Sequence, residues 1–208
     1  MRTCLLCLGL LIGSSTYAQT WVGLGMHAND ALPIYKTSQN ARVHEYKGRI
    51  KGGASLYFKR DLTQAHGHRI MNQNAILYEL GIKALSVKNT GSNIIEEYDM
   101  SYLSNALIFR HYRKSRRKAN MYYGIGGFSD YMLSGYQTEG FVETDISNHL
   151  KTINWGLVAD TGLSYWIADD VYGVFGVSYN HGLTNLESGG ETLKLHYIKI
   201  HLSAFFAL

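Results

Sequence analysis

From Thr20 to the end of the chain, apolar and polar residues alternate in segments of about ten residues, separated by polar or glycine-rich breaks. An alternation with period two is typical of a β-strand with one apolar face, and no segment keeps the 3.6-residue period of a helix for long. Eight such segments are present, at 20–27, 50–59, 75–88, 98–112, 120–135, 153–167, 171–183 and 198–208. We therefore predict an all-β fold.

The segment 153–167 separates its two faces most clearly. Its odd positions are mostly apolar, among them Trp155, Leu157 and Ile167. Its even positions are mostly small or polar, with Asp160 at the centre. Such a strand fits either a half-buried sheet of a soluble protein or a strand that crosses a membrane.

The last segment favours the membrane strand, because its apolar alternation continues to Leu208. A soluble sandwich usually ends in a polar tail, whereas a closed barrel must pair its last strand fully with its first. An even number of strands returns both chain ends to one side of the membrane, and eight is the smallest size common among bacterial single-chain barrels. The pattern predicts an eight-stranded antiparallel up-and-down transmembrane β-barrel.

The connections between the segments alternate in length. Those after the odd-numbered segments are mostly long and polar, whereas two of the other three, 113–119 and 168–170, are short. Long extracellular loops and short periplasmic turns are typical of outer membrane barrels, although the connection 60–74 is longer than this rule predicts. Pro33, the single proline, is expected in the longest outer loop, 28–48, where it removes no ladder hydrogen bond.

The start of the chain has a different pattern. Arg2 precedes an apolar stretch at 4–12, and small side chains stand at Thr16 and Ala18. This arrangement is typical of a secretory signal peptide, and a membrane anchor would need about twice the apolar length. We predict cleavage between Ala18 and Gln19.

Two domains follow from this cleavage, the signal peptide 1–18 and an outer membrane barrel 19–208. Both cysteines, Cys4 and Cys7, lie in the signal, so the barrel has no thiol for a disulfide or a thiolate metal site. With 46% hydrophobic residues, 17% charged residues and 16 tyrosines, disorder is excluded and strands are favoured. The formal charge of +4 is modest and spread along the chain, so no nucleic-acid partner is expected.

The register that turns the apolar set outward turns charged residues inward. A one-residue slip would expose them to lipid, where a lysine or arginine near the midplane costs about 2 to 4 kcal/mol. Because the interior of an eight-stranded barrel is about wide enough for its own side chains, we expect a plugged lumen, with Tyr57, Tyr122, Phe128 and Trp166 among the filling. Lys51 is also expected inside. We interpret the inward charges as a structural network rather than an ion or proton pathway, formed by Glu79, Lys83, Arg110, Asp130, Asp160 and Lys199.

Aromatic residues near strand ends are expected to point outward and form the two interfacial girdles of a membrane barrel. The residues expected in these girdles are Trp21, Tyr78, Tyr98, Tyr123, Tyr131, Trp155, Tyr165, Tyr172 and Tyr179.

Candidate chemistry is sparse. His66 and His68 offer only two ligands, too few for a protein metal site, and the basic run 113–118 is interpreted as a solvated turn. His181 suggests a surface hydrolase, with Ser178 and Glu187 nearby in sequence, but Ser178 has the opposite strand parity. We therefore expect no catalytic residue, no metal and no cofactor.

Several stretches resemble the PorT-like outer membrane β-barrel proteins of Bacteroidota. They include YLSNALIFRHY at 102–112, WGLVADTGLSYWI at 155–167 and VSYNHGLTNL at 177–186. The resemblance covers about the last hundred residues and implies an outer membrane barrel, often labelled porin-like. Some relatives are similar to components of the type IX secretion and gliding apparatus. The chain ends in Leu208, where an aromatic residue read by the insertion machinery is usual, and Phe206 is a candidate substitute.

The predicted function is that of an integral outer membrane barrel with a structural or interaction role, and not that of an enzyme. One alternative is a passive, porin-like channel for small solutes. Another is a soluble periplasmic binder resembling lipocalins, which would place apolar residues inside and charges outside. The expected partners are outer membrane lipid, the barrel-insertion machinery and other envelope proteins.

Overall fold

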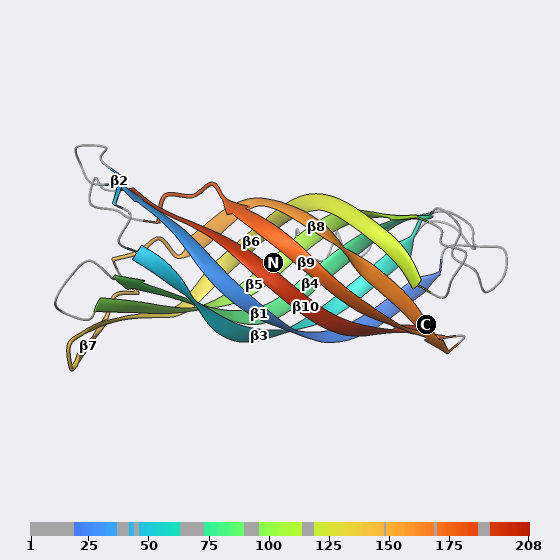
Figure 1. Cartoon of the computed structure of the whole chain (residues 1–208), viewed down its shortest axis with the longest axis horizontal. Helices are drawn as coiled ribbons and strands as arrows, with labels where there is room; N and C mark the ends of the chain where they lie inside the picture. The colour runs from blue at the N-terminus through green and yellow to red at the C-terminus, as the bar shows by residue number, and fades with distance from the viewer. Residues whose placement is uncertain are drawn as a thin grey trace, which may run out of the picture.

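The computed structural model describes residues 19–36, 42–43, 46–62, 73–89, 96–113, 119–147, 149–168, 170–186 and 192–208. Long, tilted strands form the wall of a single barrel (Figure 1). They are β1 (Thr20–Lys36), β3 (Tyr46–Asp61), β4 (Gln73–Asn89), β5 (Glu96–Arg113), β6 (Ala119–Glu139), β8 (Ile153–Ala168), β9 (Val171–Gly182) and β10 (Thr192–Ala207). Two short strands, β2 (Arg42–Val43) and β7 (Val142–Asp145), pair with the ends of β1 and β6.

The wall closes by pairing the first strand with the last. Each long strand is antiparallel to its sequence neighbour among the long strands, and β1 pairs with β10 from Trp21↔Ala207 to Lys36↔Thr192. The predicted eight-stranded antiparallel barrel is confirmed. Among the described residues no helix is long and apolar enough to span a membrane.

Several strands extend further than the apolar alternation predicts. β1 continues to Lys36 instead of ending at His27, and β10 begins at Thr192 instead of Ile198. The extra residues keep their ladder partners, as in Ile34↔Lys194, although their outward side chains include lysines. Backbone pairing therefore extends further along the chain than the apolar–polar alternation. The alternation is needed only where the wall contacts an apolar environment, and it weakens where the wall extends beyond that environment.

Pro33 lies inside β1, opposite Leu195 of β10, so its expected place in a loop was wrong. The pairing of β1 with β3 ends at Asp30↔Ile50, short of Pro33. Pro33 thus lies where β1 has a ladder partner on one side only. A proline is tolerated there because its missing N–H would have no acceptor in the neighbouring strand.

The two faces of the wall have opposite polarity. Large apolar side chains cover the outside, as shown by Ile125 and Leu157, which are 71% and 58% exposed. Charged side chains are buried inside, among them Asp130 and Arg110 at 0% and 1% exposure. A soluble lipocalin-like binder would have the reverse arrangement, so that alternative is contradicted.

The barrel has two different ends. The start of β1 and the end of β10 meet at one end of the barrel, where the Leu208 N–H donates to the Thr20 carbonyl and the Ala207 N–H donates to the Asp170 carbonyl, each at 3.0 Å. We call this the turn end, since the connection between β8 and β9 lies there. The opposite end is the loop end, from which the β6–β7 hairpin projects (Figure 1).

A charge placed on the outer wall tests its contact with lipid. Leu163 of β8 faces outward at 47% exposure, and Leu163→Arg is expected to lower the free energy of unfolding by about 2 to 4 kcal/mol in a bilayer. Val142→Arg on β7, at the loop end, is the control and is expected to change it by less than about 0.5 kcal/mol. Urea unfolding in phospholipid vesicles measures both, and equal effects would contradict an apolar wall embedded in lipid.

Candidate functional site

The lumen holds the six charges that the sequence analysis assigned to it, at exposures between 0% and 6%. They form three ion pairs. Lys83 Nζ lies 2.7 Å from Asp130 Oδ2, Arg110 Nη2 lies 2.6 Å from Asp160 Oδ2, and Lys199 Nζ lies 2.6 Å from Glu79 Oε2. Each pair has one positive and one negative member, so the group carries no formal net charge.

The three pairs join strands that are not neighbours in the wall. Arg110 on β5 and Asp160 on β8 are separated by β6. Lys83 on β4 and Asp130 on β6 are separated by β5. Lys199 on β10 reaches Glu79 on β4 past β1 and β3. The ion pairs therefore connect parts of the wall that no ladder hydrogen bond connects.

Hydroxyl groups complete the hydrogen bonding of the carboxylates. Ser178 Oγ donates to Asp160 at 2.9 Å, Ser104 Oγ to Asp130 at 2.8 Å, and Ser55 Oγ to Glu79 at 2.7 Å. A carboxylate accepts hydrogen bonds through both oxygens, and burial is tolerable only when these are satisfied. Sequence reasoning missed the three serines, although each shares the inward parity of its strand.

Aromatic rings pack against the cations. Lys83 Nζ lies 3.8 Å from the ring centre of Tyr197 and 5.3 Å from that of Phe128, and the Arg110 guanidinium lies 4.3 Å from that of Tyr122. Cation–π contacts of this kind stabilise a charge withdrawn from water. Together with the three ion pairs, these rings form the middle layer of the lumen.

A second layer, the turn-end layer, surrounds Lys59. The ring centres of Trp21, Tyr112 and Tyr172 lie 5.2, 4.9 and 4.8 Å from Lys59 Nζ. Lys59 also pairs with Asp61 at 2.9 Å, and the Trp21 indole N–H donates to the same carboxylate at 2.9 Å. The layer lies in the lumen at the turn end.

This layer corrects the expected aromatic girdles. Trp21 and Tyr172 are 1% and 0% exposed and point inward, and Tyr98 packs against the buried core. Strand parity could have predicted the inward position of Trp21, because Trp21 and His27 have the same parity on β1 and His27 is buried. Five other expected members face outward at 43% to 59% exposure, namely Tyr123, Tyr131, Trp155, Tyr165 and Tyr179.

A third layer, the loop-end layer, is apolar. Leu85 and Met100 of the wall are buried there together with residues from the connections, namely Ile146, Leu150 and Leu186 at 6%, 7% and 0% exposure. A backbone hydrogen bond joins the two connections, since the Lys151 N–H donates to the Leu186 carbonyl at 2.8 Å. The described parts of two long loops therefore fold back over the lumen.

A capping bond supports the connection after β7. The Ser147 N–H donates to Asp145 Oδ1 at 2.8 Å, and this hydrogen bond lowers the pKa of the Asp145 carboxyl. Ser147 Oγ in turn accepts from the Gly135 N–H at 2.9 Å, which ties the connection to β6.

Other expected residues lie elsewhere. Lys51 is not part of the buried network, because it is about a third exposed and pairs with Asp99 at 2.8 Å. Ser178 faces the lumen whereas His181 is on the outer face, so these two residues form no hydrolase site. Gln19 is exposed at the start of the described chain. Several other candidates lie outside the described residues, namely Ala18, His66, His68, 114–118 and Glu187.

Solved structures of outer membrane proteins are similar to this fold at low sequence identity. Neisserial surface protein A is 12% identical with a TM-score of 0.49, over 91% of this chain and 97% of that chain. OprG from Pseudomonas aeruginosa is 13% identical with a TM-score of 0.49, over the same shares. The outer membrane enzyme PagL is 11% identical with a TM-score of 0.40, over 86% and 98%. No family model and no curated protein matches the chain, so the PorT-like assignment stays a prediction.

The geometry defines a class of protein. A closed antiparallel wall, apolar outside and charged inside, meets the requirement that lipid imposes on every backbone group. The molecule is a small transmembrane β-barrel of the outer membrane type.

Breaking one lumen pair tests the middle layer. Arg110→Met leaves Asp160 buried without its cation, and we expect a loss of about 3 to 5 kcal/mol in the free energy of unfolding. The double variant with Asp160→Leu is expected to recover most of that loss, because no lone charge stays buried. Lys51→Met, which breaks the exposed pair with Asp99, is the control and is expected to cost under about 1 kcal/mol.

Unfolding in lipid vesicles measures all three variants. An Arg110→Met effect no larger than that of Lys51→Met would show that the buried pair is not the coupled unit described above.

Proposed function

We propose that this chain is an outer membrane barrel with a closed lumen that acts as a structural or interaction protein. The observation that carries this proposal is the filling of the lumen by three successive layers, the turn-end, middle and loop-end layers. A passive channel needs a water-filled passage, and an eight-stranded interior is about wide enough for side chains alone. The charges that would attract ions are already paired with one another.

The route to the membrane is part of the proposal. The signal 1–18 directs export and is cleaved between Ala18 and Gln19, and the barrel-insertion machinery then assembles the mature chain. The turn end faces the periplasm and the loop end faces outward, as in other barrels with short turns at the end that carries the termini. Kinship with PorT-like barrels fits this route and rests on the sequence stretches quoted above.

An interaction role fits the β6–β7 hairpin. Gly140 takes a positive φ of 61° at its turn, and the next two side chains, Phe141 and Val142, are 107% and 66% exposed. Exposed apolar side chains beyond the wall favour contact with another envelope protein. The lumen pairs have a structural role in this proposal, and no enzymatic step is assigned to the barrel.

Planar-bilayer recording tests the closed lumen. The purified mature barrel, folded as judged by different gel mobility with and without boiling, is expected to give no steady openings, because no water-filled path crosses the three layers. A general porin purified in the same detergent is the control for successful insertion. Steady openings on the nanosiemens scale would overturn the proposal and favour a passive channel for small solutes.

A further inference from the structure

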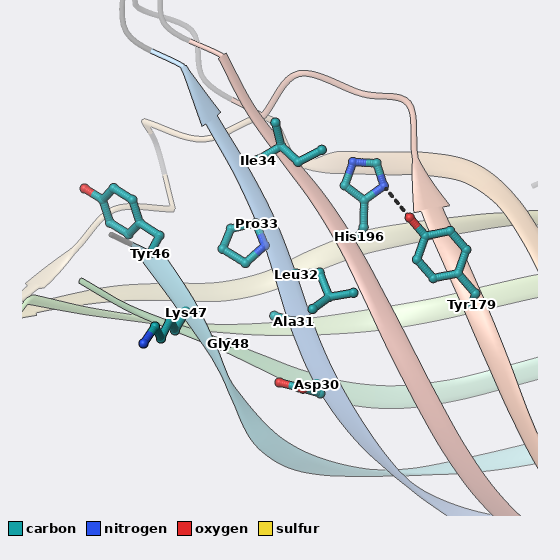
Figure 2. Close-up of a pocket in the computed structure, with 10 residues that line it drawn as sticks. All are labelled: Asp30, Ala31, Leu32, Pro33, Ile34, Tyr46, Lys47, Gly48, Tyr179 and His196. Carbon is teal, nitrogen blue, oxygen red and sulfur yellow. Dashed lines mark hydrogen bonds between the residues drawn. The ribbon is translucent and has the colours of Figure 1, made fainter. Parts of the chain in front are cut away.

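The outer wall has a crevice near the loop end (Figure 2). One hollow of about 540 Å³ lies along β1 and is lined by Tyr46 of β3, His196 of β10 and Tyr179 of β9, among others. A second hollow of about 440 Å³ lies next to the first, on its loop-end side, and is lined by Lys36 and Lys194 among others. Because both hollows are lined by Ile34 and His196, we treat them as one β1–β10 crevice.

The crevice exists because two strands separate. The β1–β3 register ends at Asp30↔Ile50, whereas β1 stays paired with β10 up to Lys36. Gly48 forms the last close approach, since a Cβ on it would lie 1.8 Å from the Ala31 carbonyl oxygen. Beyond that contact the strands diverge, and Pro33 has no N–H with which to extend the ladder (Figure 2).

A cluster of polar rings lies on this outward face. His196 is opposite His181 in the β9–β10 register, and their ring centres are 4.3 Å apart. The Tyr179 hydroxyl lies 3.5 Å from His196 Nδ1, and the two rings are stacked (Figure 2). Polar rings on the outside of a membrane wall fit the level of the lipid headgroups and not the hydrocarbon core.

Two lysines border the cluster on the side of the loop end. Lys36 is paired with Thr192 and Lys194 with Ile34, so the two cations lie on neighbouring strands two register positions apart. Within the part of the chain that the structure describes, neither is in an ion pair, whereas Arg49 and Lys51 pair with Glu97 and Asp99. Two like charges this close favour an anion between them.

On β9 and β10 the same face is apolar toward the barrel's middle, whereas Asp30 lies opposite Ile198 on β1. Ile198 and Val177 are 36% and 39% exposed, and Ile198 is opposite Tyr179 in the register. The order along β10 is therefore cationic at Lys194, aromatic at His196 and apolar at Ile198. This order matches an amphipathic ligand that has an anionic group for the cationic level, a polar ring for the aromatic level and hydrocarbon chains for the apolar level.

We propose that the β1–β10 crevice binds the phosphate-bearing headgroup of an outer-leaflet glycolipid. Lys36 and Lys194 contact the phosphate, the exposed His181 and Tyr179 pack against the sugar over the buried His196 ring, and the acyl chains lie over Ile198. Basic pockets at membrane interfaces recognise lipid headgroups by this chemistry. The proposal rests on the barrel's orientation in the outer membrane but not on its closed lumen, so conductance and lipid binding fail independently.

Native mass spectrometry of the detergent-solubilised mature barrel tests the proposal. The probes are bisphosphorylated lipid A, phosphatidylcholine and inorganic phosphate. Lipid A is expected to bind, and the double variant Lys36→Gln/Lys194→Gln is expected to bind it about tenfold more weakly, because each cation near the membrane surface adds to headgroup attraction. Lys88→Gln/Lys151→Gln removes two charges outside the crevice lining and is expected to bind like the unaltered barrel.

Three results would overturn the proposal. An equal loss in both double variants would mean that overall charge, and not the crevice, attracts the lipid. Phosphatidylcholine binding as tightly as lipid A would remove the requirement for an anionic glycolipid. Inorganic phosphate binding as tightly as lipid A would indicate a free-anion site. Unboiled gel mobility confirms that each variant is folded before it is compared.

Discussion

The pairing of β1 with β10 is the interaction on which the rest of the structure depends. Hydrocarbon offers no hydrogen-bond partner, so an open sheet edge would leave a row of buried N–H and C=O groups unsatisfied. The ladder from Trp21↔Ala207 to Lys36↔Thr192 removes that edge. Once the wall is closed, every second residue must face lipid and the others must face a narrow interior. The polarity of the whole chain follows from this division.

The narrow interior then requires that its charges be matched. An unpaired ion withdrawn from water costs several kcal/mol, and a pair with good hydrogen bonding reduces that cost without necessarily adding net stability. In the middle layer each carboxylate has a cation and a hydroxyl donor, and the pairs join strands that are not neighbours. We interpret the pairs as specifying which parts of the wall face each other, and the aromatic and apolar layers as filling the two ends.

Strand parity made much of this predictable from the sequence. It assigned Glu79, Asp130 and Asp160 to the inside because lipid would reject them on the outside. The partners were not predictable, since Lys199 reaches Glu79 only through the stagger of β10, β1, β3 and β4, which the sequence does not reveal.

The predicted positions of two residues were wrong, because in each case a general rule was applied where a local hydrogen bond or strand pairing determined the position. Trp21 was assigned to a girdle by its position near a strand end, but Asp61 offers its indole N–H a buried acceptor. Pro33 was assigned to a loop, but β1 continues along β10 with no partner opposite it on β3. The β1–β10 crevice follows from the same departure, because it opens where β1 leaves β3.

Access of water to the middle layer tests the closed lumen most directly. Residues 19–208 contain no cysteine, so Ser178→Cys in a barrel of these residues, at a position 1% exposed beside Asp160, places a single thiol in the lumen. Val142→Cys, at 66% exposure on β7, gives the rate of a free thiol. With a charged, water-soluble methanethiosulfonate, the closed lumen predicts rapid labelling at 142 and none at 178 until the barrel is unfolded. Labelling at 178 in the folded barrel at a rate near that at 142 would contradict it.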